Sequence, residues 1–290
     1  MTERRTHTLE VPGAVLHYDV REARSGDRPA LLAIGSPMGA AGFDILAGHF
    51  TDRTVITYDP RGSERSVRTD GAERTTPQEH ADDLRRILDV VGLAPVDVFA
   101  SSGGAVNALV LVESGATERL RTVVAHEPPA ADVLPDRTEA LAASQAIHDI
   151  YLKDGMGAGM AKFIELISLR GPVPADYAAR PAPDPATFGL PTEDDGSRDD
   201  ALLGQNMVSS THHRYDFEAL KTAPVRLVLA AGADSEGELA YRGAVAIAER
   251  LGVAPVIFPD GHGGFLGGEY GQTGKPDEFA AKLREVLDEG

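Results

Sequence analysis

The stretch Val98-Phe99-Ala100-Ser101-Ser102-Gly103-Gly104-Ala105 decides the fold of this 290-residue chain. It joins an apolar run at 96–100, which is typical of a buried strand, to an apolar segment at 103–113 that is typical of a helix. Two serines and two glycines stand between them, so the chain must turn from strand to helix within very few residues. The stretch therefore predicts a sharp strand-to-helix turn, and a serine stands at its apex.

Geometry selects Ser102 rather than Ser101 as the serine at the apex. In such a turn, the side chains two residues before and two residues after the apex crowd each other, so both must be small. Ser102 has Ala100 and Gly104 at those positions, whereas Ser101 would place Phe99 in the turn. We therefore take Ser102 as the candidate nucleophile, and the free N–H groups at the start of the following helix point towards its reaction site.

Outward from this turn, strand-like apolar runs alternate with helical patterns of three- and four-residue spacing. The expected strands are 8–11, 15–20, 30–34, 54–58, 96–100, 121–125, 225–230 and 255–258, and the expected helices are 77–91, 103–113, 238–251 and 276–287. Continuous apolar runs indicate strands that are covered on both faces. The alternation predicts an α/β fold with a mostly parallel, doubly wound sheet.

The alternation stops between residues 130 and 222. Helices are expected there around 138–151 and 156–169, then a proline-rich stretch at 171–191, then a helix that begins near Asp199. A helical insertion that interrupts an α/β sheet is typical of a cap. We expect a core formed by residues 1–129 and 223–290 and a helical cap formed by residues 130–222.

Four segments together resemble the α/β-hydrolase superfamily, in particular its capped, serine-nucleophile, esterase- and haloperoxidase-like members. They are Ile34-Gly35-Ser36-Pro37-Met38, Tyr58-Asp59-Pro60-Arg61-Gly62-Ser63-Glu64-Arg65-Ser66, the turn at Ser102, and Phe258-Pro259-Asp260-Gly261-His262-Gly263-Gly264-Phe265. The resemblance covers nearly the whole chain and implies the α/β-hydrolase fold. It also implies an oxyanion hole made by the backbone N–H groups of Ser36 and Gly103. In three places the chain departs from the family pattern: Ile34 stands where His is usual, Glu64 replaces a glycine, and Ala100 stands where glycine is commoner.

The resemblance also assigns the base and the acid. His262 follows the last expected strand and stands among glycines, where the family places its catalytic histidine. Asp234, just after the strand at 225–230, is the first choice of acid, because a carboxylate there can fix the histidine tautomer and stabilise the imidazolium. Glu127 is the alternative, since some family members take the acid from the end of the preceding strand. Asp260 stands too close to His262 in the chain to face it.

Composition limits the remaining possibilities. The formal net charge of −17 repels phosphate backbones and anionic membrane surfaces, so nucleic acid and membrane are not expected partners. The chain has no cysteine, which excludes disulfides and thiolate metal sites, and no metal site is expected. The first ten residues are polar and no run approaches the roughly 20 apolar residues of a membrane helix, so we expect a cytoplasmic protein.

These observations predict a serine hydrolase that uses no cofactor and cleaves a carboxylic ester or related acyl substrate. The same three residues also serve C–C hydrolases, perhydrolases and haloperoxidase-like members of the superfamily, and a non-catalytic ligand-binding protein on this fold is the other alternative. The expected partner is a small-molecule substrate, and assembly into a homo-oligomer stays open. The candidate pocket residues are Met38, Met156, Met160, Phe163 and Met207.

Overall fold

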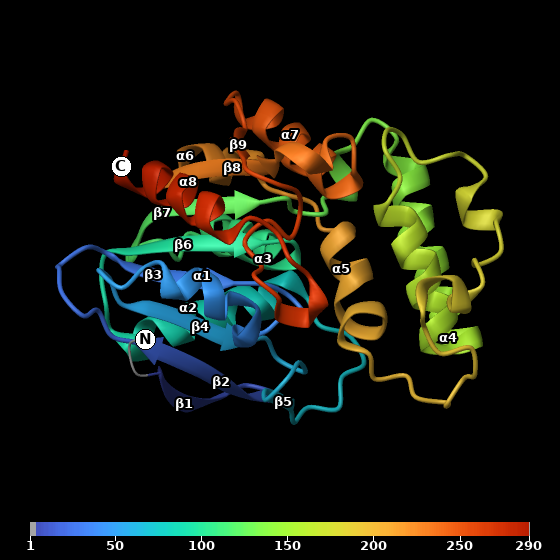
Figure 1. The fold of residues 1–290 in the computed structure, drawn as a ribbon, viewed down its shortest axis with the longest axis horizontal. Helices are drawn as coiled ribbons and strands as arrows, with labels where there is room; N and C mark the ends of the chain where they lie inside the picture. The colour runs from blue at the N-terminus through green and yellow to red at the C-terminus, as the bar shows by residue number, and fades with distance from the viewer. Residues whose placement is uncertain (1–3, 290) are drawn as a thin grey trace.

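Within the residues that the structure describes, a nine-stranded sheet has helices on both of its faces (Figure 1). The computed structural model describes residues 4–289. The strands are β1 (Arg4–Val11), β2 (Ala14–Arg21), β3 (Ala30–Ile34), β4 (Val55–Asp59), β5 (Val67–Arg68), β6 (Val96–Ser101), β7 (Leu120–His126), β8 (Arg226–Gly232) and β9 (Val256–Phe258). The helices are α1 (Asp44–Gly48), α2 (Pro77–Val91), α3 (Gly103–Glu113), α4 (Arg137–Ile167), α5 (Met207–Thr211), α6 (Phe217–Thr222), α7 (Leu239–Leu251) and α8 (Pro276–Asp288).

The strand order is β1-β2-β4-β3-β6-β7-β8-β9, and β5 pairs with β2. Strands β1 and β2 form the expected antiparallel hairpin, and β2 also pairs antiparallel with β4. From β4 through β3 to β9 every neighbouring pair is parallel. The predicted fold class, a mostly parallel and doubly wound sheet, is confirmed.

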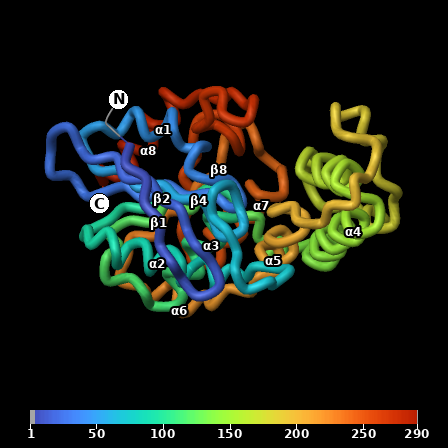
Figure 2. Tube along the Cα trace, turned by 90° about the horizontal axis from the view of Figure 1, so that it is seen from below, coloured from blue at the N-terminus to red at the C-terminus, as the bar shows by residue number. Residues whose placement is uncertain are grey.

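Two apolar clusters fill the space between the sheet and its helices. One cluster lies against α2, α3, α6 and α7, and the other lies against α1 and α8 on the opposite face. Seen along the sheet, the two sets of helices sandwich the strands (Figure 2). Helix α3 is buried along nearly its whole length, because its residues are almost all apolar or small. This burial makes α3 a rigid support for the turn that precedes it.

The chain from α4 to α5 lies beyond the carboxyl ends of the central strands (Figure 1). It has an apolar cluster of its own, built mainly from α4, α5 and the loops between them. Gly155 interrupts α4 with φ of 89° and ψ of −178°, which matches the expectation of two helices in this region. Helix α6 falls inside the range 130–222 expected for the cap, and its Leu220 is buried in the cluster that lies against α3. The bounds of the cap stay a prediction.

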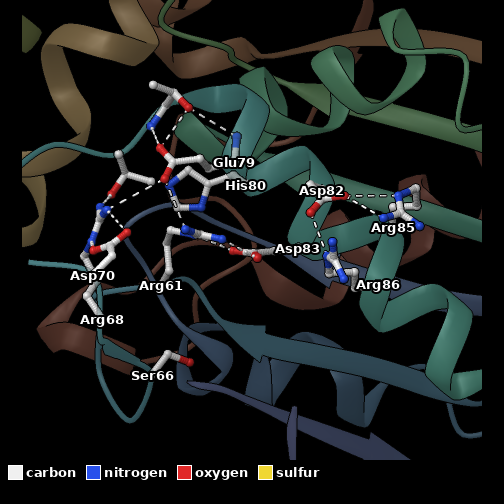
Figure 3. A network of polar contacts seen from close by, with 12 residues as sticks. Arg61, Ser66, Arg68, Asp70, Glu79, His80, Asp82, Asp83, Arg85 and Arg86 are labelled. Atoms are coloured by element: carbon white, nitrogen blue, oxygen red, sulfur yellow. Dashed lines mark hydrogen bonds and ion pairs between the residues drawn. The ribbon is translucent and has the colours of Figure 1, made fainter. Parts of the chain in front are cut away.

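A polar network fixes the loop that follows β4. Arg61 donates two hydrogen bonds to the buried Asp83 carboxylate on α2, at 2.7 and 2.6 Å, and a third to Glu79 at 3.1 Å. Figure 3 shows Arg61 pointing at both acidic side chains. Asp59, at the end of β4, accepts a hydrogen bond from the Ala40 N–H at 2.8 Å. The Asp-Pro-Arg-Gly segment therefore anchors the chain around the loop that follows β3.

Candidate active site

The candidate residues lie at one edge of the sheet because parallel strands end at the same edge. Strands β3, β6, β7, β8 and β9 are consecutive neighbours in the sheet. Ser36, Ser102, Glu127, Asp234 and His262 each follow the end of one of these strands, in that order. The fold thus brings residues separated by more than 200 positions to a common edge.

Ser102 occupies the strained apex of the turn between β6 and α3. Its φ of 57° and ψ of −129° lie in a region that non-glycine residues rarely adopt. Its N–H donates to the carbonyl oxygen of His126 at 3.0 Å, so the neighbouring strand β7 holds the turn in place. The sharp turn predicted at Ser102 is present, and the serine is partly accessible to solvent.

The loop after β3 packs directly against the start of α3. A Cβ atom on Gly103 would overlap the carbonyl oxygen of Ser36, and one on Gly104 would lie 2.7 Å from the Gly35 Cα. Only glycine fits at these two positions. The close approach places the backbone of the buried Ser36 beside the first turn of α3, which is where the predicted oxyanion donors must meet.

Glu127 is the carboxylate that contacts His262. The two side chains are hydrogen-bonded, with 2.6 Å between the Glu127 Oε2 and the His262 Nδ1. Glu127 has φ of 48° and its side chain is 0% exposed. Its other oxygen accepts hydrogen bonds from the Gly232 N–H at 2.8 Å and from the Ser235 hydroxyl.

The environment keeps Glu127 ionised. Burial alone would raise the pKa of this carboxyl, but the hydrogen bond from His262, the nearby imidazoles and the Ser235 hydroxyl outweigh it. The net effect lowers the pKa of Glu127 to about 2. A carboxylate that stays charged beside an imidazole can fix its tautomer and stabilise its protonated form.

Asp234 does not occupy the position expected of the acid. Its side chain is 63% exposed and points to Lys275, with 3.5 Å between the Asp234 Oδ2 and the Lys275 Nζ. The short turn Ala233–Ser235 directs Ser235, one residue later, inwards to Glu127. The structure therefore corrects the choice of Asp234 in favour of Glu127, which the sequence had offered as the alternative.

His262 projects from the loop after β9 and leaves its Nε2 free of Glu127, with 41% of its side chain exposed. No hydrogen bond joins Ser102 to His262 in the part of the chain that the structure describes. Contacts of this kind often tighten only when substrate is bound. Asp260 accepts a hydrogen bond from the backbone N–H of Gly261 at 2.7 Å.

Four of the five candidate pocket residues pack within the cap. Met207 is buried in the cap cluster, and Met156, Met160 and Phe163 pack against it. Met38 instead lies in the loop after β3, against Gly35 and Gly42. A surface groove of about 640 Å³ lies elsewhere, beside α7, and none of the five residues lines it. A role for these residues in binding substrate stays a prediction.

Within residues 4–289 no group of three or more metal-ligating side chains is close enough together to hold a metal ion. Within the same residues no helix combines the length and the apolar character needed to cross a membrane.

Comparison with known proteins identifies the family. The uncharacterized hydrolase YraK of Bacillus subtilis (strain 168) is 31% identical over 287 residues, which is 97% of this chain and 95% of that protein. The chain is a member of the α/β-hydrolase superfamily. A scan against models of protein families finds no match.

Solved structures of other α/β-hydrolases share the fold across almost the whole chain. The carboxylesterase CesB of Bacillus subtilis is 16% identical with a TM-score of 0.66, and the match covers 99% of this chain and 93% of that one. A putative aryl esterase from Burkholderia cenocepacia is 19% identical with a TM-score of 0.63, and 98% of each chain is covered. The enol-lactonase of Burkholderia xenovorans LB400 is 17% identical with a TM-score of 0.65, over 97% of this chain and 100% of that one. These similarities confirm the predicted fold.

Sequence reasoning about this α/β-hydrolase missed two side chains that meet at the site. Ser235 supports the acid, and the fully buried His126 lies beside both Ser101 and His262. A signal for Glu127 was present, since this acidic residue stands two positions after the apolar run 121–125 and two prolines then end the strand. For Ser235 the sequence carried no such signal.

Proposed function

We propose that this α/β-hydrolase is a serine hydrolase that uses no cofactor and cleaves carboxylic esters or related acyl substrates. The observation that carries the proposal is the buried Glu127 carboxylate paired at 2.6 Å with His262, on the strand edge where Ser102 stands in a strained turn. A charged acid, an oriented imidazole and a hydroxyl on a sharp turn are the parts that acyl transfer to serine requires.

The proposed reaction has two halves. The His262 Nε2 takes the proton of the Ser102 hydroxyl while the Ser102 Oγ attacks the substrate carbonyl. The oxyanion that forms receives hydrogen bonds from the N–H groups of Ser36 and Gly103. His262 then gives that proton to the leaving alcohol, and the acyl group stays on Ser102. In the second half His262 takes a proton from water, the hydroxide attacks the acyl-enzyme, and the carboxylic acid leaves as Ser102 regains its proton.

Glu127 stays ionised throughout this cycle. Its negative charge stabilises the imidazolium of His262 in both halves, and its hydrogen bond keeps the proton of the neutral ring on Nδ1. The Nε2 is then the basic nitrogen, and it faces away from Glu127. Solved structures with the same fold include a carboxylesterase and an enol-lactonase, which supports the proposal of an acyl substrate.

Covalent labelling tests the proposal. A fluorophosphonate should modify one residue of the wild-type protein, identified by mass spectrometry as Ser102. Ser102→Ala should lose labelling and turnover while keeping its melting temperature, and Ser101→Ala is the matched control because its hydroxyl stands one residue away. Labelling that survives Ser102→Ala and disappears with Ser101→Ala would refute the assignment of the nucleophile.

A screen of esters then separates the alternatives that share the triad. Hydrolysis of p-nitrophenyl or alkyl esters of graded chain length, lost in Ser102→Ala, supports ester cleavage. A labelled protein that cleaves none of them but breaks a C–C bond or supports peroxide-dependent halogenation performs the alternative chemistry. A wild-type protein that takes up no label is a ligand-binding protein on this fold. A cytoplasmic location stays a prediction alongside this proposal.

A further inference from the structure

His126 is a buried histidine that the proposed reaction does not use. It is the last residue of β7 and precedes Glu127 directly. Its side chain is fully buried. Its ring is enclosed by aromatic rings whose centroids lie 5.3 to 6.5 Å away, from Phe99, Phe258, Phe265 and Phe279.

Three contacts connect His126 to the candidate active site. Its Nδ1 lies 3.2 Å from the hydroxyl of Ser101, the residue before the nucleophile. Its carbonyl oxygen accepts the N–H of Ser102 at 3.0 Å. Its ring stacks on the imidazole of His262, with 6.1 Å between centroids and 29° between planes. His126 therefore contacts both the turn that carries the nucleophile and the base.

Stability does not explain a histidine at this position. The Nε2 of His126 is buried and has no hydrogen-bond partner within the described residues. A buried polar atom without a partner destabilises the folded state, and an apolar side chain among four phenylalanine rings would avoid that cost. Burial lowers the pKa of His126 to about 4, although Glu127 acts in the opposite direction. The ring is therefore neutral near pH 7 and does not repel a protonated His262.

We propose that His126 is a positioning residue whose ring face fixes the plane of the His262 imidazole. The inference rests on the proposed function. The hydrogen bond to Glu127 holds the Nδ1 edge of the His262 ring, and it touches neither face of that ring. Because His262 is 41% exposed, much of its surface has no packing partner. The stacked face of His126 supplies the second contact, and it directs the Nε2 towards the turn at Ser102.

Two substitutions at one position separate the ring face from the ring nitrogens. His126→Leu removes the planar face and the polar atoms, whereas His126→Phe keeps a planar ring of similar size and removes only the nitrogens. His80→Leu on α2 is the matched control, because His80 is also fully buried with one unpartnered nitrogen but lies outside this strand edge. It reports what replacing any buried histidine with leucine does to the protein.

The readouts are kcat and KM on the best ester, the rate constant of labelling by a fluorophosphonate, and the melting temperature. A misplacement of about 1 Å costs on the order of 100-fold in rate, so His126→Leu should lower kcat and the labelling rate by about 10- to 100-fold. Its KM should change little, and its melting temperature should be equal or higher. We expect kcat of His126→Phe and of His80→Leu to stay close to the wild-type value.

Two kinetic outcomes overturn the proposal. If kcat and labelling of His126→Leu equal those of the wild type, His126 only fills space. If His126→Phe is as slow as His126→Leu, the ring nitrogen rather than the ring face carries the effect. Labelling that is absent from the wild-type protein contradicts the proposed function instead.

Nuclear magnetic resonance of the wild-type protein provides a test that needs no variant and no substrate. A held imidazole should give one sharp, far-downfield proton signal for the hydrogen bond between His262 and Glu127. The ring protons of His126 and His262 should show a nuclear Overhauser effect. A signal broadened by rotation of His262, or no Overhauser effect between the two rings, overturns the proposal even where His126→Leu fails to fold.

Discussion

Replacing Glu127 by glutamine changes one oxygen of the site into an amide nitrogen. The acid accepts hydrogen bonds on both oxygens, from Gly232 and Ser235 on one and from His262 on the other. The amide oxygen can keep the first two donors, which leaves the NH2 group to face His262. An NH2 group only donates, so it requires the His262 Nδ1 to accept. The proton of the neutral ring then moves to Nε2, which can no longer take a proton from Ser102.

The expected loss follows from the tautomer and the charge together. In a related triad the same carboxylate-to-amide change lowers turnover by about ten-thousand-fold, which corresponds to roughly 5 kcal/mol in activation free energy. Glu127 is 0% exposed, so water cannot replace the missing negative charge. We expect Glu127→Gln to lose about four decades of kcat while it keeps its fold, because two of its three hydrogen-bond donors remain satisfied.

Asp234→Asn is the matched control, because it makes the same chemical change at the position that sequence reasoning preferred. The Asp234 side chain is largely exposed and pairs with Lys275 at 3.5 Å, and exposed pairs of this kind contribute about 0–1 kcal/mol to stability. Its turnover and melting temperature should stay near the wild-type values. Turnover on the best ester and thermal melting of both variants are the measurements. A nearly inactive Asp234→Asn beside an active Glu127→Gln would contradict the structure, and losses of only a few-fold in both would contradict His262 as the general base.

Two further predictions concern Ser235, which bonds the acid, and the buried histidines His80 and His126. Ser235→Ala removes one hydrogen-bond donor from the Glu127 carboxylate but leaves the Gly232 N–H. We therefore expect kcat to fall by roughly tenfold, the effect of about 1.4 kcal/mol, with KM unchanged. A kcat equal to that of the wild type would mean that Ser235 does not orient the acid. Burial lowers the pKa of both His80 and His126 to about 4, while the unfolded chain binds these protons near pH 6.5. Their folded pKa values are depressed, so the free energy of unfolding should fall as pH drops from about 6.5 to 4. Denaturant unfolding across this range should show a smaller fall in His126→Leu, and an identical fall in both proteins would show that His126 does not titrate as stated.

Long, strongly patterned elements could be predicted from the sequence. Helix α2 begins at Pro77 and ends before Gly92 as expected, because Thr76 caps its start and Gly92 takes φ of 71° at its end. Helix α3 and strand β3 also match their expected ranges. In each case the hydrophobic period, the terminal residues and the burial agree.

Short elements could not be predicted, because few residues leave no period to recognise. Helix α1 spans five residues, β5 two and α6 six. Their positions depend on tertiary contacts, such as the burial of Leu220 under α3, which no local pattern encodes. Because no local pattern shows that α6 packs under α3, the range 130–222 expected for the cap includes this helix.

The acid shows where reasoning from motif position reaches its limit. Glu127 and Asp234 both follow the end of a parallel strand, so each is delivered to the same edge of the sheet. The choice depends on the conformation of a three-residue turn. The Asp234 N–H donates to the carbonyl oxygen of Asp260 at 2.9 Å, and this bond places the carboxylate outside while Ser235 points inwards. At Glu127 the backbone has φ of 48° and its N–H donates to the carbonyl of Ala230 at 2.9 Å, which continues the pairing of β7 with β8 and keeps the side chain inside. Two backbone hydrogen bonds therefore decide which carboxylate meets His262, and neither can be read from the identity of the residues.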